Sequence, residues 1–483
     1  MRARMSWLSE AEKEAVVVAA LDVLERVGIE LRGSRALPLL AAQGAKVDEV
    51  TGVARLPHEL VRAAIAQCPR GFIMGGAAPE FDIELGEGRP TRFGSSGCAA
   101  FILDHETGER RHSMLTDLQA ATALLDEVEQ VDVMWTSITA NDVPAEDREL
   151  VVAYTVFAES RKHVTLVDSP SRAEPLIAMM EVLAGSRDAF RARPRFSTLL
   201  TAASPLRVDG PLLDFHATTA AYGAPVEIFA LPMAGATGPV TIAGTLVQGL
   251  AEVLGLITAL QMLAPGARCI VGEAGATMDM RSAGFSYGAP EATLMNAASI
   301  ELAHYLGLPA ITPGLATDGK YAGIQVGYEK ALKGLVTAGA QSDLMSGGVG
   351  MIDTVNTISL PQIVIDAEIV ATVRRLLADV DLSREAMFVD MIERVGIGGD
   401  YLKEKETSKR LRAGEHFLPV IATRQGYDAW RADGRREVER ALERMAVLLA
   451  RRAERPPAME PERRSALARI CGVTPDMVRA LGH

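Results

Sequence analysis

Leu231-Pro-Met-Ala-Gly-Ala-Thr-Gly-Pro-Val opens the stretch of sequence that decides the fold, which continues to Tyr328. Within this stretch, apolar runs repeatedly end in small, polar or acidic residues. The polar segments are Met278-Asp-Met-Arg, Phe285-Ser-Tyr-Gly-Ala-Pro-Glu, Thr317-Asp-Gly-Lys and Gln325-Val-Gly-Tyr-Glu-Lys. Polar and aromatic residues gathered after successive strands are how a (β/α)8 barrel builds an active site from several loops. The stretch therefore predicts an enzyme with a barrel fold.

Helices and strands alternate on both sides of this stretch, from about Leu115 onward. The predicted strands are Val131–Ile138, His163–Val167, Phe196–Thr201, Val226–Leu231, Arg268–Glu273, Pro309–Thr312 and Asp343–Gly347. Helix-strand alternation implies a parallel sheet joined by right-handed crossovers. These seven strands, with one more from the region Phe72–Gly97, suffice to close a TIM barrel. An open doubly wound sheet is the alternative, but it requires a glycine-rich phosphate loop after an early strand, and none is present there.

The chain of 483 residues exceeds the size at which a single core stops growing, so additions to the barrel are expected. We predict an α/β fold in three segments. Residues 1–70 form a helical N-terminal segment, residues 71–360 form the TIM-barrel domain, and residues 361–483 form a helical C-terminal extension.

Composition excludes several classes of function. The formal charge of −12 argues against a nucleic-acid surface, which needs clustered cations. Four cysteines without a paired pattern indicate a reducing, cytoplasmic compartment. The N-terminus lacks the pattern of a signal peptide. The apolar run Leu246–Leu263 carries three polar residues at helical spacing, which predicts an amphipathic or buried helix and no membrane span.

Acidic and basic residues stand at or after the ends of two of the predicted strands. Glu273 ends a strand among small residues, where an acid at a barrel's active face is often functional. Asp279 and Arg281 follow it, and a loop-fixing ion pair is an equally good reading of these two. Asp318 and Lys320 follow the next strand, where a simple turn is the alternative.

Aromatic residues also gather near the predicted strand ends: Trp135, Phe229, Phe285, Tyr287 and Tyr321. Trp135 and Phe229 are equally consistent with packing in the barrel wall. Phe285 and Tyr287 stand among Gly284, Ser286 and Gly288, where packing in regular structure is less natural. Aromatic faces beside a carboxylate are a known way to bind a quaternary ammonium, which has no N–H to donate.

Searches for other chemistries are negative. The sequence contains no HExxH motif and no GxSxG elbow, and its eight histidines show no metal-ligand spacing. Cys269 opens an apolar strand, where a buried thiol is inert. The residues therefore favour binding and orientation of a substrate, with the reactive atom supplied by a cofactor or a partner.

Several long motifs, in order, resemble the trimethylamine methyltransferase family. They are Pro232-Met-Ala-Gly-Ala-Thr-Gly-Pro-Val, Met278-Asp-Met-Arg, Phe285-Ser-Tyr-Gly-Ala-Pro-Glu, Thr317-Asp-Gly-Lys with Gln325-Val-Gly-Tyr-Glu-Lys, and Phe417-Leu-Pro with Gly426-Tyr-Asp-Ala-Trp. The match covers nearly the whole chain. The resemblance implies a (β/α)8 barrel that moves a methyl group from a methylated amine to the Co(I) corrinoid (cobamide) of a separate carrier protein.

Founding members of this family contain pyrrolysine, whereas this chain has only standard residues, so it resembles the non-pyrrolysine branch. That branch is associated with quaternary amines such as glycine betaine, proline betaine or carnitine. The enzyme would hold one methyl group in line with cobalt and exclude water. Ser346 stands where many relatives carry a histidine, and the residue within 316–325 that replaces pyrrolysine is not fixed by the sequence.

The resulting hypothesis is a methyltransferase for a betaine-like amine. Glu273, Asp318 and Lys320 are the candidate catalytic residues. Substrate contacts are expected from Trp135, Phe229, Asp279, Arg281, Phe285, Tyr287, Tyr321, Gln325 and Ser346. We expect no directly bound cofactor or metal, a corrinoid protein as partner, no nucleic acid, no membrane, and association of the chain with itself. The alternatives are a non-catalytic protein that binds a quaternary amine or a corrinoid protein, and a barrel enzyme with an unrelated metal-dependent reaction.

Overall fold

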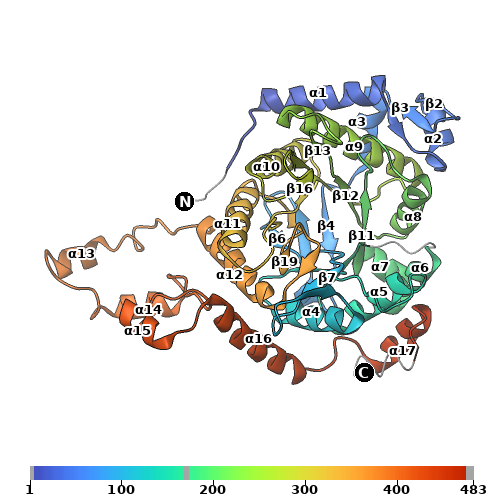
Figure 1. The fold of residues 1–483 in the computed structure, drawn as a ribbon. Coiled ribbons are helices and arrows are strands. Elements are labelled where there is room, and N and C mark those ends of the chain that lie inside the picture. The colour runs from blue at the N-terminus through green and yellow to red at the C-terminus, as the bar shows by residue number, and fades with distance from the viewer. Residues whose placement is uncertain (1–4, 168–172, 475–483) are drawn as a thin grey trace.

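The centre of the protein is a closed barrel of eight parallel strands, which Figure 1 shows end-on. The structure is a computed structural model and describes residues 5–167 and 173–474. Single bridges, from Gly94 to Val133 and from Val271 to Ala310, join two sheets into one ring. In ring order the strands are β6 (Arg92–Phe93), β9 (Val133–Trp135), β10 (His163–Leu166), β11 (Phe196–Thr201), β12 (Val226–Ala230), β14 (Cys269–Glu273), β17 (Ile311–Thr312) and β18 (Leu344–Met345).

The predicted TIM barrel is therefore confirmed. All seven predicted strands are present, and β6 is the eighth strand expected from the region Phe72–Gly97. A ring of helices covers the barrel: α4 (Leu115–Glu127), α5 (Arg148–Glu159), α6 (Glu174–Ala184), α7 (Arg187–Ala192), α8 (Gly210–Ala221), α9 (Ile242–Leu263), α10 (Pro290–Tyr305), α11 (Ile324–Gly339) and α12 (Leu360–Leu377). Because α12 packs against both α11 and α4, it completes this ring.

Strand periodicity decides which residues face the interior. Along β12, Phe229 packs inside the barrel with Trp135 of β9, whereas Ile228 and Ala230 pack against the helices. A hairpin of β4 (Gly71–Met74) and β5 (Ile83–Gly86), with the short helix η1 (Pro79–Phe81) in its turn, supplies apolar residues to the same interior cluster. Gly75 N–H donates to Pro194 O and Gly86 N–H to Asp343, at the starts of two strands. The hairpin thus closes the N-terminal end of the barrel.

The N-terminal segment lies against α9. Its elements are α1 (Glu10–Arg26), β1 (Ile29–Glu30), α2 (Ala36–Ala42), β2 (Lys46–Asp48), β3 (Val53–Arg55) and α3 (His58–Gln67). α1, α2 and α3 all pack on α9, whose 22 residues are long and apolar enough to cross a membrane. Most of its apolar window, 78%, is buried inside the protein, as in the core helix of a globular fold.

Two small sheets stand near the strand exits. One consists of β13 (Met233–Ala234), β15 (Ala276–Asp279) and β16 (Gly284–Ser286). The other consists of β7 (Phe101–Leu103), β8 (Arg110–His112), β19 (Met351–Ile352) and β20 (Thr357–Ile358). Each element of these sheets follows a barrel strand, so both sheets belong to the C-terminal end of the barrel, where active sites of this fold lie.

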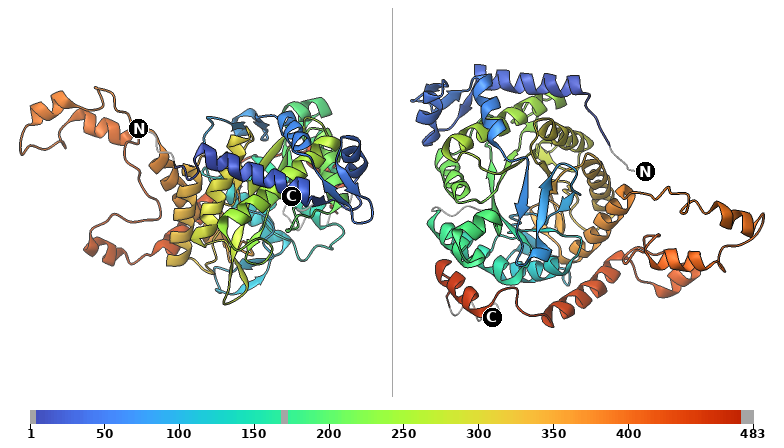
Figure 2. Two further views of the ribbon diagram at one scale, coloured as in Figure 1. Left: turned by 90° about the horizontal axis from the view of Figure 1, so that it is seen from above. Right: turned by 180° about the vertical axis from the view of Figure 1, so that it is seen from behind.

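The C-terminal region leaves the barrel and returns to it. α13 (Val389–Val395), α14 (Lys405–Arg412) and α15 (Tyr427–Asp433) extend away from the body, as both views of Figure 2 show. α16 (Glu437–Ala453) then packs on α12 and α4, and α17 (Pro461–Ile470) on α6. The three-segment division of the chain stays a prediction.

Candidate active site

Four of the five predicted aromatic residues lie in one cluster at the strand-exit end of the barrel. Phe285 and Tyr287, on and after β16, meet edge to face, with ring centroids 4.7 Å apart at 71°. Trp135 and Phe229 point into the barrel and belong to the same apolar cluster. Tyr287, Trp135 and Phe229 are buried, and Phe285 is partly exposed. We call these four residues the aromatic cluster.

Asp318 fixes the loop that carries Tyr287. Its Oδ1 accepts the Tyr287 N–H at 2.9 Å, and its Oδ2 accepts the Gly288 N–H at 2.9 Å. The Thr354 hydroxyl donates to Oδ1 at 3.1 Å. Asp318 follows β17, whereas Tyr287 follows β16, so one carboxylate joins two loops that are far apart in sequence. This placement agrees with the prediction that Asp318 and Tyr287 lie at one end of the barrel.

A second carboxylate supports Asp318 from below. Glu329, on α11, accepts the Asp318 N–H at 2.9 Å and the Thr317 hydroxyl at 2.5 Å. Gln325, a predicted substrate contact one turn earlier, donates to Glu329 at 2.9 Å. Gln325 therefore acts on the loop through Glu329 in this structure.

Lys333 is a buried cation beneath Tyr287 that sequence reasoning missed. Its Nζ donates to Tyr287 O at 3.0 Å and lies 5.2 Å from the centroid of the Tyr287 ring. Burial lowers the pKa of Lys333 to about 7, although the charges of Asp318 and Glu329 oppose the shift. Burial also raises the pKa of the Tyr287 phenol, and the negative charge of Asp318 adds to that rise. A usable signal existed, because Gln325, Glu329 and Lys333 recur every four residues and so share one helix face.

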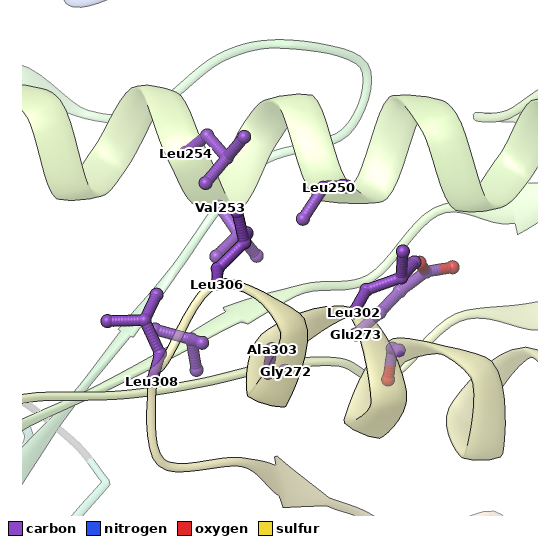
Figure 3. Close-up of a pocket in the computed structure, with 11 residues that line it drawn as sticks. Leu250, Val253, Leu254, Gly272, Glu273, Leu302, Ala303, Leu306 and Leu308 are labelled. Carbon is purple, nitrogen blue, oxygen red and sulfur yellow. The ribbon is translucent and has the colours of Figure 1, made fainter. Parts of the chain in front are cut away.

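Glu273 does not join the aromatic cluster. Its side chain lies between β14 and the helices α9 and α10, at the edge of a cavity of ≈ 20 Å³ (Figure 3). The cavity is otherwise mostly apolar, with Leu250 and Leu254 on one side and Leu302 on the other. A Cβ on Gly249 of α9 would stand 2.5 Å from the Glu273 carboxyl carbon, so the glycine makes room for this side chain.

The electrostatics of Glu273 follow from this burial. Its Oε1 is buried and has no hydrogen-bond partner. Burial, and next the charge of Glu252, raise its pKa well above the ordinary value. Strand alternation explains the direction: Gly272 faces the interior against Ile311 O, so the next residue faces the helices. The expected convergence of Glu273 with Phe285, Tyr287 and Asp318 is therefore not what the structure shows.

The charged residues on the loops are mostly in water. Arg281 pairs with Asp279 at 2.9 Å and its side chain is 91% exposed, which is the loop-fixing ion pair that the sequence left open. That pairing lowers the pKa of Asp279 to about 2. Lys320 is exposed and contacts Asp353 at 2.9 Å, and Tyr321 is 70% exposed. These four side chains lie outside the aromatic cluster.

Ser346 lies at the exit of β18. It is buried, and its hydroxyl is 3.5 Å from Thr312 O. The loop that follows is held by Lys330 and Asp366, a fully buried pair with a 2.5 Å contact. Lys330 Nζ donates to Gly348 O at 2.7 Å, and Asp366 accepts the Gly350 N–H at 2.7 Å.

Glu227 is a second buried carboxyl group that the sequence did not single out. It points into the barrel from the start of β12, one inward position below Phe229. Its Oε1 accepts the hydroxyls of Thr165 and Ser197, both at 2.7 Å. Burial raises the pKa of Glu227 to about 7. These contacts form a polar layer beneath the aromatic cluster. The only feature of the sequence that could indicate this layer is a glutamate inside an apolar strand.

A large cavity lies away from the aromatic cluster. A cavity of ≈ 340 Å³ lies at the opposite, N-terminal end of the barrel beside Arg70, His304 and Asp343. Among the described residues, no group of three or more His, Cys, Asp or Glu side chains is placed to hold a metal ion.

The family match and the similar sequences all point to amine methyltransferases. The family described as trimethylamine methyltransferase (MTTB) matches residues 1–471. The chain is 30% identical over 447 residues to the trimethylamine methyltransferase MttB of Desulfitobacterium hafniense (strain DSM 10664 / DCB-2), covering 92% of this chain and 89% of that one. It is 29% identical over 457 residues to the glycine betaine methyltransferase of Desulfitobacterium hafniense (strain Y51), covering 94% of this chain and 94% of that one.

A solved structure shares the fold. The monomethylamine methyltransferase MtmB of Methanosarcina barkeri superposes with a TM-score of 0.52 at 10% identity, covering 93% of this chain and 89% of that one. At this identity the likeness concerns the fold alone.

Proposed function

Because the chain belongs to the trimethylamine methyltransferase family, we propose that it transfers a methyl group from a betaine-like quaternary amine to the Co(I) corrinoid of a separate carrier protein. The observation that carries the choice of substrate is the aromatic cluster with Asp318 beside it. A quaternary ammonium has no N–H, so it is bound through aromatic faces and nearby negative charge. The chain contains no pyrrolysine, so no adduct with that residue is available to activate an uncharged tertiary amine.

The proposed reaction requires little of the protein beyond the correct placement of the substrate. The corrinoid supplies a nucleophilic Co(I), and the carbon–nitrogen bond breaks with both electrons remaining on nitrogen. The tertiary amine therefore leaves uncharged and needs no proton from the enzyme. The aromatic cluster would hold the ammonium so that one methyl group faces the strand-exit end, where Phe285 is partly exposed. Such orientation and the exclusion of water are where the rate gain would arise.

We assign separate roles to the charged groups around the cluster. Asp318 would hold the Tyr287 loop in its binding position and add negative potential near the ammonium. Lys333 would support Tyr287 from beneath through its carbonyl oxygen. We leave Glu273 out of the reaction, because its carboxyl group faces α9. Lys320, Arg281 and the other exposed loop residues are candidates for contacts with the substrate carboxylate or with the carrier protein.

The setting of the reaction follows from the same proposal. Cys68, Cys269 and Cys471 are buried thiols, which supports a reducing, cytoplasmic environment. The corrinoid would arrive at the strand-exit end of the barrel on its carrier, and neither a nucleic acid nor a membrane would take part.

One observation favours a second candidate, a protein of this fold that binds a quaternary amine without turnover. Ser346, which stands where we expect a histidine from the family resemblance, is buried and contacts Thr312 O. If the reaction depends on that histidine, the barrel would bind its ligand and leave the methyl group in place.

The experiment combines the purified protein, Co(I) cobalamin or a corrinoid carrier protein, and a panel of amines. The panel is glycine betaine, proline betaine, carnitine and trimethylamine. Loss of the Co(I) absorbance with a quaternary amine, and not with trimethylamine, is the expected result. Tight binding of a betaine by calorimetry with no loss of Co(I) would favour the second candidate, and neither binding nor loss with any quaternary amine would refute the proposal.

A further inference from the structure

The outer surface of the barrel has an apolar face where water is expected. Ile324, Tyr328 and Leu332 recur every four residues along α11 and are 89%, 52% and 60% exposed. The solvent side of a surface helix is normally polar. Beside this row, α11 and α12 border a groove of ≈ 300 Å³. Its apolar lining includes Leu332, Leu335, Ile365, Ile369, Leu376 and Ile421. We call the row and the groove together the α11–α12 face.

A second unpartnered apolar surface lies on the segment between α12 and α15. Residues 379–419, which we call the arm, contain α13 and α14 and extend away from the barrel (Figures 1 and 2). Met391 is the one buried residue in this segment, all of which the structure describes. Nine of its large apolar residues are at least 40% exposed: Leu382, Met387, Val389, Ile392, Ile397, Tyr401, Leu402, Leu411 and Leu418.

The base of the arm is firmly attached beside the groove. Glu368 of α12 accepts the backbone N–H groups of Val420, Ile421 and Ala422 at 2.5, 2.6 and 2.8 Å. Arg375 of the same helix donates to Glu415 O at 2.9 Å. The arm therefore leaves from α12 and returns to it, while its apolar residues are exposed to solvent.

The size of the arm's apolar surface matches a stable interface. A buried aromatic side chain removes roughly 150–250 Å² from water, and smaller apolar side chains remove less. The nine exposed apolar residues of the arm together therefore offer on the order of 800 Å², which is what one partner contributes to a standard interface. Exposed apolar surface of this extent on a soluble protein marks an interaction site.

We propose that two copies of this chain exchange arms, so that the arm of each copy lies across the α11–α12 face of the other. Both surfaces belong to the same chain. In a dimer with a two-fold axis, the arm of each copy covers the α11–α12 face of the other, so no surface is left over and the assembly is closed. The apolar character of both surfaces suits a permanent contact, because obligate interfaces are the more hydrophobic ones. A carrier protein that must come and go would meet the strand-exit end, whereas Leu332 and the groove lie farther along α11 and α12 on the side of the barrel. The exchange does not depend on the proposed function.

The first test is sedimentation of the full chain and three variants. The wild-type protein is expected to sediment at twice its 51.5 kDa or a multiple of that mass. Leu332→Glu on the α11–α12 face and Leu402→Glu on the arm are each expected to weaken association at least about 100-fold, with an unchanged circular dichroism spectrum. Val50→Glu is the control, because Val50 is 89% exposed but lies in the turn between β2 and β3 of the N-terminal segment, and it is expected to leave the mass unchanged.

The second test locates the contact. A photoreactive benzoylphenylalanine in place of Leu332, in a copy with one affinity tag, is mixed with wild-type copies carrying another tag. The expected product is a covalent pair of chains, with the cross-linked peptide from residues 380–419 of the wild-type copy. A monomeric wild-type protein at micromolar concentration, or cross-links only within one chain or only to a corrinoid carrier, would overturn the proposal.

Discussion

Asp318 and Glu273 both follow barrel strands, yet the two regions around them are built for different purposes. Asp318 accepts three hydrogen bonds, two of them from the backbone of the Tyr287 loop, and lies beside the aromatic cluster. Glu273 has a buried oxygen without any partner and lies in an apolar layer between β14 and α9. A buried carboxyl group without donors favours its protonated form, which is the direction of the raised pKa of Glu273. Position at a strand end is therefore not enough to make an acidic residue functional. The direction in which its side chain points decides its role.

The largest effect is expected from removing the carboxylate of Asp318. Asp318→Ala leaves the N–H groups of Tyr287 and Gly288 without acceptors, and two lost bonds to a charged group cost about 3 kcal/mol or more. We expect kcat/KM for methyl transfer from a betaine to fall about 100-fold, measured as the rate of Co(I) loss. Asp318→Asn keeps one acceptor oxygen and should retain an intermediate rate. Equal rates for Asp318→Ala and the wild type would show that the loop does not need this anchor.

A smaller effect is expected from the ring of Tyr287. Tyr287→Ala removes one aromatic face from the cluster, and a cation–π contact contributes about 1–2 kcal/mol. KM for a quaternary amine should therefore rise about tenfold, with a smaller change in kcat. Tyr287→Phe is the matched control, because it keeps the ring, and it should stay within about threefold of the wild type. If the two variants behaved alike, the hydroxyl and not the ring would be the important group.

Substitution of Lys333 tests the region beneath the aromatic cluster, and its effect is expected in the dependence of the free energy of unfolding on pH. Its pKa of about 7 in the folded state lies below the 10.5 of the unfolded chain, so between these values the unfolded state binds more protons. Stability should then rise with pH from about 7 to 10.5, and Lys333→Met should lose that rise. Urea titrations at pH 7 and pH 9.5 measure both slopes.

Lys333→Met is also expected to weaken substrate binding at the aromatic cluster. Without the contact from Nζ to Tyr287 O, worth about 1 kcal/mol, KM should rise about fivefold. Identical pH slopes for the variant and the wild type would mean that Lys333 is not titrating in this range.

The smallest effect on activity is expected from Glu273→Gln. The substitution keeps the shape of the side chain in the layer against Gly249, so the rate of methyl transfer should change less than about threefold. Stability should change instead. The folded pKa is raised above 4.5, so the wild-type protein loses stability as the pH rises from there toward the folded pKa, and the glutamine variant does not. A large loss of activity at unchanged stability would return Glu273 to the reaction.

The fold was predictable from the sequence because it rests on periodicity. Strands such as Phe196–Thr201 are marked by apolar runs between helical segments, and β11 has those bounds in the structure. The eighth strand, Arg92–Phe93, is only two residues long, so the sequence located its region and not its position. Backbone pairing with β18, and the bridge to β9, define it instead.

The candidate site was predictable only in part. The sequence predicts five aromatic candidates, because they lie near strand ends or among small residues. The structure brings four of these five together in the aromatic cluster. The direction of Glu273 was not predictable, because a shift of one residue in the strand register reverses it. Lys333 is missed from the sequence because a lysine on a polar helix face resembles a solvent-exposed residue until its neighbours, Tyr287 and Asp318, are known.

The most direct test of the central claim is the position of glycine betaine in a crystal of the protein at saturating concentration. We predict the trimethylammonium group within about 6 Å of the ring centroids of Phe285 and Tyr287, with one methyl group facing the strand-exit end. Betaine bound instead beside Glu273, or in the cavity at the N-terminal end of the barrel near His304, would contradict the assignment of the aromatic cluster as the substrate site.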